Sequence, residues 1–198
     1  MKLILIALVA VVVGMMAGCS NSADLPLDEI VSLMRSGEKH STVTKGSDGK
    51  LTRRYDLALI DFTKVIEAMP NHTEALKYRA KTYEALGKRE LATKDWDRLI
   101  DLKPVFTLRL HYISRGENYY AQGHNERALK DFTKAIELNR DYLYEGDPYF
   151  RRSLVYETLQ QPDKSDADAA EACRLGVNQN IRREAPWLEE KVGFKCAK

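Results

Sequence analysis

Apolar residues recur at helical spacing in residues 73–104, where the pattern predicts two short amphipathic helices joined by a tight turn. Gly87 separates the two helices, because a residue without a Cβ atom can adopt the positive φ that such a turn requires. Pro104 ends the second helix, since proline cannot donate a backbone hydrogen bond. Neither helix can bury its apolar face alone, so the unit needs neighbouring copies. The apolar positions of the pair are Leu76, Ala80, Tyr83, Ala92, Trp96, Leu99 and Ile100.

Copies of this unit lie on both sides of it. The segment Asp61–Glu67 reads DFTKVIE and returns as DFTKAIE at Asp131–Glu137. A more distant copy, DWDRLID, begins at Asp95, and a weaker fourth, DAAEACR, begins at Asp168. The leading aspartates are 34, 36 and 37 residues apart, which is the period of a helix-turn-helix solenoid with small loop insertions.

Small, aromatic and turn residues agree at the same positions of three successive copies. The second copy has Leu76, Arg79, Ala80, Tyr83, Gly87, Ala92, Trp96, Leu99 and Pro104. The third has Tyr112, Arg115, Gly116, Tyr119, Gly123, Ala128, Phe132, Ala135 and Arg140, and the fourth has Tyr149, Arg152, Ser153, Tyr156, Gln160, Ser165, Ala169, Ala172 and Val177. Over residues 54–177 this pattern resembles the tetratricopeptide repeat (TPR). The resemblance implies an all-α fold, a right-handed superhelix of about four helix-turn-helix repeats within residues 26–177.

The first 18 residues have the features of a signal peptide. An apolar run of eleven residues, Leu3–Val13, is too short to span a bilayer as a permanent helix. The small residues before Cys19 resemble a bacterial lipobox, which implies that Cys19 is lipidated and that residues 19–25 form a lipidated tether. Ser20 resembles the outer-membrane class, so the expected location is the cell envelope, as an outer-membrane lipoprotein facing the periplasm. The alternative is an ordinary secretory signal in which Cys19 is incidental.

The first repeat departs from the pattern in its first half. Residues 26–36 predict a helix with Pro26 in its first turn, and Gly37 is expected to end it. Residues 38–53 contain turn-forming sequence, so we expect a long loop or irregular hairpin, mobile rather than functional, before a second helix at Tyr55–Met69. The apolar stripe of the first helix consists of Leu27, Ile30, Val31 and Met34.

Residues 178–198 follow the last repeat and are expected to cap the solenoid, because an end repeat exposes an apolar face. Trp187 and Leu188 would be the buried anchors of this capping segment. Cys173 takes the position at which the other repeats have isoleucine, so its side chain should face the capping segment. In an oxidising envelope we expect a disulfide between Cys173 and Cys196. The alternative is a buried core cysteine and an exposed thiol.

Charge and motifs give no support for nucleic-acid binding or catalysis. Lys2 is the only charged residue among the first 18, so the 180 residues that follow carry 30 basic and 29 acidic side chains. The four histidines show no metal-ligand spacing, and Ser, Cys and His form no recognisable nucleophile signature. We therefore expect no cofactor, no metal site and no enzymatic activity.

The TPR resemblance also implies a binding groove. In that family the first helices of successive repeats line a concave surface that contacts partner peptides. Lys77 and Lys81 match part of a set that grips a C-terminal carboxylate in one subclass, but Leu110 and Ser114 do not, so a cytosolic co-chaperone function is not implied. The groove positions are Lys77, Lys81, Glu84, Leu110, Ile113, Glu117, Tyr120, Asp147, Phe150, Leu154 and Glu157. Four of them would form an apolar centre, unless the capping segment or a packed neighbour covers them: Ile113, Tyr120, Phe150 and Leu154.

These features predict an adaptor or assembly factor, anchored in the envelope, that binds a protein or peptide partner through the concave groove. A first alternative is a structural role, in which exposed end faces stack molecules into a homo-oligomer. A second is an uncharacterised envelope enzyme, which would need a pocket with perturbed ionisable groups.

Overall fold

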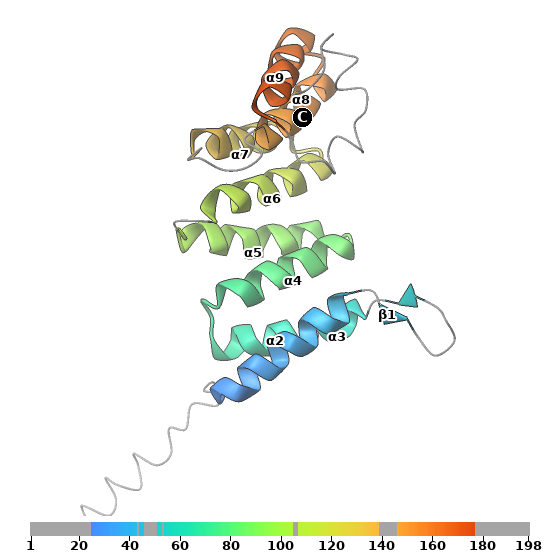
Figure 1. Cartoon of the computed structure of the whole chain (residues 1–198), viewed down its shortest axis with the longest axis vertical. Helices are drawn as coiled ribbons and strands as arrows, with labels where there is room; N and C mark the ends of the chain where they lie inside the picture. Colours follow the sequence, from blue (N-terminus) through green and yellow to red (C-terminus); the bar gives the residue numbers. More distant parts are fainter. Residues whose placement is uncertain are drawn as a thin grey trace, which may run out of the picture.

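Helices make up nearly all of the residues that this computed structural model describes, namely 25–42, 44–45, 51–52, 54–104, 107–138 and 146–176. Consecutive helices pack in pairs, and each pair packs on the next, so that the pairs form one stack along the long axis (Figure 1). The predicted all-α fold of four helix pairs is confirmed. The helices are α2 (Leu27–Ser41), α3 (Tyr55–Ala68), α4 (Thr73–Ala85), α5 (Arg89–Asp101), α6 (Leu108–Ala121), α7 (Asn125–Glu137), α8 (Asp147–Thr158) and α9 (Pro162–Leu175).

Large aromatic residues of the second helices fill the core of the repeats. Trp96 is 1% exposed, and Phe62 and Phe132 occupy the equivalent buried positions on α3 and α7. Each ring meets a small residue on the first helix of its own pair. A Cβ atom added at Gly116 would lie 2.8 Å from the Phe132 ring, which is closer than side chains tolerate. The packing of a large side chain on one helix against a small residue on the other therefore lets the two helices of a pair lie close together.

Residues with a left-handed backbone conformation form the turns between the two helices of a repeat. Gly87 and Gly123 have φ values of 71° and 77°, which confirms the prediction that glycine permits these turns. The fourth repeat has Gln160 at this position, and it adopts φ 55° without the freedom of glycine. The turn geometry is therefore set by the packing of the helix pair as well as by the local sequence.

The prediction that Gly37 ends the first helix is wrong. The helix α2 continues through Gly37 to Ser41, and Gly37 is buried against Phe62, where an added Cβ would lie 2.5 Å from the ring. Glycine is present here because α2 approaches α3 closely. Gly116 permits the same close approach of α6 to α7 in the third repeat. The chain then enters a short antiparallel hairpin of strands β1 (Thr44–Lys45) and β2 (Leu51–Thr52) before α3 begins.

Several predicted segments lie outside the described residues, and they stay predictions. These are residues 1–18, Cys19, and the capping segment 178–198 with Cys196. Leu25, the last residue of the predicted tether, packs against the core formed by the first two repeats. Cys173 on α9 is fully buried and disulfide-bonded, while its predicted partner lies beyond the described part of the chain. Within the described residues, no helix is long and apolar enough to cross a membrane.

The burial of Trp96 makes its replacement a test of the core. Trp96→Ala is expected to lower the free energy of unfolding by about 3 to 5 kcal/mol, because it leaves a large cavity. It also removes the hydrogen bond that the indole Nε1 donates to Glu84 at 2.7 Å. Urea unfolding followed by circular dichroism measures the change, with the exposed Leu91→Ala on the same helix as the control. Equal losses in the two variants would show that the repeats do not depend on this core position.

Candidate functional site

The helix α4 carries three of the predicted groove residues. Lys77 is half-buried, and its ammonium group forms an ion pair with Glu74. Lys81 is exposed. Glu84 is half-buried and accepts hydrogen bonds from Trp96 Nε1, at 2.7 Å, and from the side-chain amide of Asn118. Glu84 therefore joins the second repeat to the third, whereas Lys81 presents its charge to solvent.

The helix α6 carries four more predicted groove residues, and they differ widely in exposure. Leu110 is 50% exposed, whereas Ile113 is 8% exposed. Glu117 forms an ion pair with Arg151 of α8. Tyr120 is half-buried, and its hydroxyl lies 2.9 Å from Thr158 Oγ1, also on α8. Leu110 is thus the predicted groove residue on α6 that offers a large apolar surface.

The helix α8 carries the remaining groove positions. Phe150 is 6% exposed and packs with residues of α9, and Leu154 is partly buried against the same cluster. Asp147 is half-buried. Glu157 is exposed, and its carboxylate accepts a hydrogen bond from Ser165 Oγ at 3.0 Å. The last repeat therefore uses most of these side chains for packing or for contacts inside the protein.

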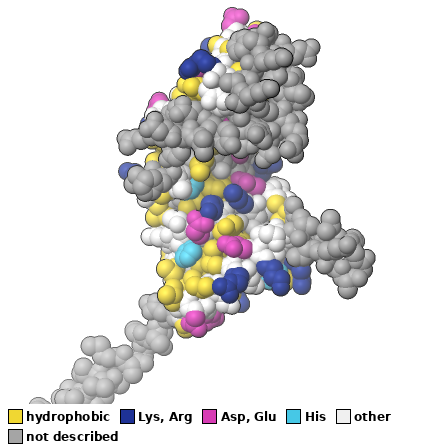
Figure 2. Space-filling model, viewed as in Figure 1, with side chains coloured by type: hydrophobic (Ala, Val, Ile, Leu, Met, Phe, Trp, Pro, Cys, Tyr) yellow, Lys and Arg dark blue, Asp and Glu magenta, His cyan; other side chains and the backbone are white. Residues whose placement is uncertain are grey.

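The predicted apolar centre is consequently not one exposed patch. Ile113 and Phe150 are buried, and Tyr120 and Leu154 are partly buried between helices. Hydrophobic side chains gather instead over the first helix pairs, in the lower part of the view in Figure 2, with acidic and basic side chains between them. The binding role of the groove residues stays a prediction, and the exposed ones are Lys81 on α4, Leu110 on α6 and Glu157 on α8.

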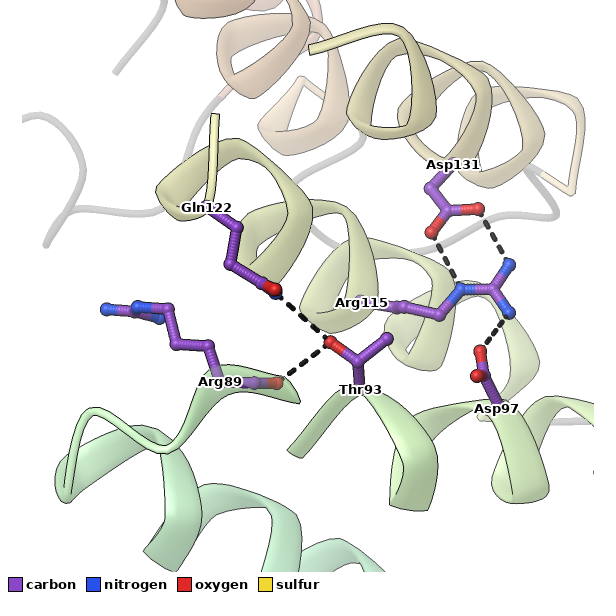
Figure 3. Close-up of polar contacts among 6 residues, drawn as sticks. All are labelled: Arg89, Thr93, Asp97, Arg115, Gln122 and Asp131. Atoms are coloured by element: carbon purple, nitrogen blue, oxygen red, sulfur yellow. Dashed lines mark hydrogen bonds and ion pairs between the residues drawn. The ribbon is translucent and has the colours of Figure 1, made fainter. Parts of the chain in front are cut away.

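Arg115 on α6 makes a contact that the sequence analysis missed (Figure 3). Its guanidinium donates two hydrogen bonds of 2.8 Å to the carboxylate of Asp131 on α7, and Nη1 donates a third, of 2.7 Å, to Asp97 on α5. Burial lowers the pKa of Arg115, but Asp131 and Asp97 outweigh this effect and raise it. One permanently charged side chain therefore joins three consecutive helices.

The same arrangement recurs in the neighbouring repeats. Arg79 donates to Asp95 at 2.7 and 2.8 Å, and Arg152 donates to Asp168 at 2.7 and 2.9 Å. Each of the three arginines thus pairs with an aspartate of its own repeat and also contacts the preceding repeat. We call each arginine, together with both of these contacts, an inter-repeat clamp. The remaining acceptors are Thr63 Oγ1, 3.3 Å from Arg79, and Thr133 Oγ1, 3.0 Å from Arg152.

A signal for the clamps is present in the sequence. The arginine and the leading aspartate are both repeated, and they are 16 residues apart in the second, third and fourth repeats. Aromatic residues also recur around each arginine. Tyr112 and Tyr119 place their ring centroids 5.4 and 5.8 Å from the Arg115 guanidinium, at cation–π distance.

The first repeat has no arginine at the clamp position. Since Gly37 packs on Phe62 as Gly116 packs on Phe132, Ser36 takes the place of Arg115. The leading aspartate, Asp61, instead pairs with His40, whose Nδ1 lies 3.0 Å from its carboxylate. His40 lies one turn after Ser36, at the position that Tyr119 takes in the third repeat, and from there its imidazole replaces the guanidinium as the partner of the leading aspartate.

A second set of polar contacts joins the second and third repeats (Figure 3). The Gln122 side-chain amide on α6 donates to Thr93 Oγ1 on α5 at 3.3 Å, and this hydroxyl donates to the backbone carbonyl of Arg89 at 2.9 Å. Arg89 Nη1 in turn lies 3.5 Å from Asn118 Oδ1. These contacts hold the end of α6, whereas Arg115 holds its middle.

His111 is buried between the same two repeats and is 4% exposed. Its ring lies 5.6 Å from the Trp96 ring. Burial is the main cause that lowers the pKa of His111 from 6.5 to about 4, and the positive charge of Lys77 lowers it further. Glu74 and a hydrogen bond with the Leu99 backbone act in the opposite direction, but they are weaker. The imidazole is therefore neutral at pH 7.

One hollow of the described surface does not coincide with the predicted groove. It has a volume of 680 Å³ and lies between α5, α6 and α7, where Arg115 and Asp131 line it together with Ile100, Tyr112 and Leu129. Because Arg115 and Asp131 are paired with each other, they offer no acid or base for catalysis. In the part of the chain that the structure describes, no group of three His, Cys, Asp or Glu residues could hold a metal ion.

Known proteins share this pattern of helices. Residues 112–142 match the family model described as "Tetratricopeptide repeat". Human "Tetratricopeptide repeat protein 13" is 31% identical over 109 residues, which are 53% of this chain but 12% of that protein, so the chain spans a small part of this relative.

Solved structures agree with this match. A thermophilic TPR protein of Thermus thermophilus is 26% identical, with a TM-score of 0.59 and 83% of each chain covered. The first TPR domain of Spaghetti (RPAP3), solved with an HSP90 peptide, is 23% identical, with a TM-score of 0.53 and 69% of this chain and 97% of that chain covered. The helix pairs therefore pack as TPR repeats do.

A double-mutant cycle tests the clamp between Arg115 and Asp131. Arg115→Ala leaves the buried carboxylate of Asp131 without its partner, so we expect it to lower the free energy of unfolding by about 3 to 5 kcal/mol. Asp131→Ala should lower it less, because the half-buried Arg115 keeps its ion pair with Asp97. The double variant should lose less than the sum, with a coupling of about 1 to 3 kcal/mol. The exposed pair Lys134 and Glu137 provides the matched cycle, for which we expect no measurable coupling. Additive losses at Arg115 and Asp131 would contradict the clamp.

The low pKa of His111 predicts a specific dependence of stability on pH. The unfolded chain binds a proton at His111 near pH 6.5, whereas the folded chain does so only near pH 4. The contribution of neutral His111 to stability is therefore complete above pH 6.5, and it is lost as the pH falls toward 4. It amounts to about 3 kcal/mol at most. Urea unfolding between pH 4 and pH 7 should show this loss in the wild type and a shallower loss in His111→Leu. Parallel curves would show that His111 titrates normally in the folded protein.

Proposed function

We propose, from the premise that this chain is a tetratricopeptide repeat protein, that it is an adaptor or assembly factor held at the cell envelope by a lipid on Cys19. TPR domains bind protein or peptide partners, and the first TPR domain of Spaghetti (RPAP3) does so with an HSP90 peptide. In this proposal the concave face of the helix stack binds one protein or peptide of the envelope.

The observation that carries the proposal is the exposure of two groove residues on neighbouring first helices. Lys81 on α4 is exposed, and Leu110 on α6 is 50% exposed. An exposed cation and an exposed leucine on neighbouring first helices suit a partner segment that combines an acidic and an apolar side chain. The helices that carry them are fixed by the clamps and by Glu84, so the two side chains are held in place before a partner binds.

The sequence before Leu25 supports the location. The apolar run followed by small residues and Cys19 favours acylation, and an acylated terminus keeps the domain at a membrane. We propose the periplasmic side of the outer membrane, because Ser20 resembles the outer-membrane class.

Two other functions have less support. Self-assembly into a homo-oligomer would use the ends of the stack, and light scattering on residues 24–198 distinguishes it from a monomeric adaptor. An enzymatic role has little support from the described side chains. The strongly perturbed pKa values belong to the half-buried clamp arginines, which are paired with aspartates, and to His111, which is buried against Trp96.

Affinity capture from detergent-solubilised envelopes tests the adaptor function. The baits are the wild type and the groove variant Lys81→Glu with Leu110→Asp. The matched control, Lys94→Glu with Leu91→Asp, makes the same changes at exposed positions of the second helix α5. Phe150 is unsuitable as a groove probe, since its replacement would disturb the core.

A partner retained by the wild type and the control, and reduced at least about tenfold with the groove variant, is the expected result, because charge reversal acts on a central contact. Circular dichroism must show that both variants fold. If both variants retain the same partner, the concave face between α4 and α6 is not its binding site.

A further inference from the structure

We infer that α2 lies against the lipid headgroups, with Leu27 and Val31 inserted into the membrane surface. The inference rests on the proposed lipid anchor at Cys19 and adds a second, non-covalent contact to it. The partner of this surface is therefore a lipid bilayer, and the contact would orient the helix stack with its first repeat at the membrane.

Apolar residues lie on two different sides of α2. Ile30 is 5% exposed and belongs to the core, and Met34 packs against the same core. Leu27 and Val31 are four residues apart, which places them on one face, and they are 73% and 48% exposed. Among the large hydrophobic residues that the structure describes, Leu27 is the most exposed. The packing of the repeats therefore leaves this part of α2 uncovered.

The length of the tether identifies the membrane as the occupant. Leu25 already packs against the core, so at most five residues, 20–24, separate Cys19 from the folded body. Fully extended, this segment spans about 21 Å. A lipid on Cys19 would thus keep Leu27 close to the headgroups at all times. Tethering also makes the contact intramolecular, so two apolar side chains suffice where they could not bind a free protein.

The charges around the two residues favour a zwitterionic surface. Asp28 and Glu29 are exposed in the first turn of α2, next to Leu27. A dense layer of anionic headgroups would repel this turn. The contact is therefore driven by apolar insertion, and phosphatidylethanolamine is a better surface for it than phosphatidylglycerol.

Photocrosslinking at defined positions tests the contact. The variant Leu27→p-benzoylphenylalanine is compared with Ser32→p-benzoylphenylalanine, which places the same probe at an exposed position elsewhere on α2. The native lipidated protein is placed in vesicles of phosphatidylethanolamine and phosphatidylcholine. In a second arm, a hexahistidine tag replaces Cys19 of the mature chain and binds a nickel-chelating lipid in the same vesicles. Lipid adducts are quantified by mass spectrometry.

The expected yield of lipid adducts is about tenfold higher at position 27 than at position 32, because the tether brings both to the surface but only position 27 lies on the face of α2 that meets the lipid. Adding Val31→Asp to the Leu27 probe, or replacing half of the lipid by phosphatidylglycerol, should lower that yield several-fold. Equal yields at the two positions, or crosslinks from position 27 to protein instead of lipid, overturn the inference. A native protein that does not float with vesicles would reject the anchor, whereas the tagged arm still decides the contact of α2.

Discussion

The structure depends on half-buried arginines that are paired with buried aspartates between helices. Arg79, Arg115 and Arg152 each hold an aspartate of their own repeat and an oxygen of the preceding one. Apolar packing alone would let one helix pair slide or rotate on the next, since hydrophobic contacts are not directional. A bidentate guanidinium–carboxylate pair accepts only a narrow geometry. The bidentate pairs therefore fix the two helices of a repeat against each other, and the third contact of each arginine joins that pair to the preceding repeat.

The sequence was sufficient to predict the parts of the fold that depend on local pattern. The helix pairs follow from apolar spacing, and the turns follow from Gly87 and Gly123. Gly37 was misinterpreted, because glycine serves both to end a helix and to permit close helix packing, and only the position of Phe62 distinguishes the two. The clamp residues were noted one by one, yet their pairing requires two helices to be placed side by side.

The candidate site was only partly predictable for the same reason. The position of a residue within the repeat was enough to place it on a first helix. Whether its side chain is exposed depends on the neighbouring helix that it contacts. Ile113 and Leu110 lie three residues apart on α6, and one is buried while the other is exposed. Glu84 occupies a groove position but binds Trp96 and Asn118 instead of solvent. Only some of the predicted groove positions are therefore accessible to a partner, namely Lys81, Leu110 and Glu157.

The side chain of the preceding repeat that accepts a hydrogen bond from the clamp arginine differs along the stack. Asp97 is a charged acceptor at 2.7 Å between the second and third repeats, whereas Thr63 is a neutral one at 3.3 Å between the first and second. The first repeat, moreover, pairs Asp61 with the imidazole of His40 instead of a guanidinium. Under a mechanical load applied at the N-terminal end, the first repeat would consequently separate from the second before the second separates from the third, and the repeats that carry Lys81 and Leu110 would stay together. The first repeat would act as a yielding element between an anchor and the surface that binds the partner.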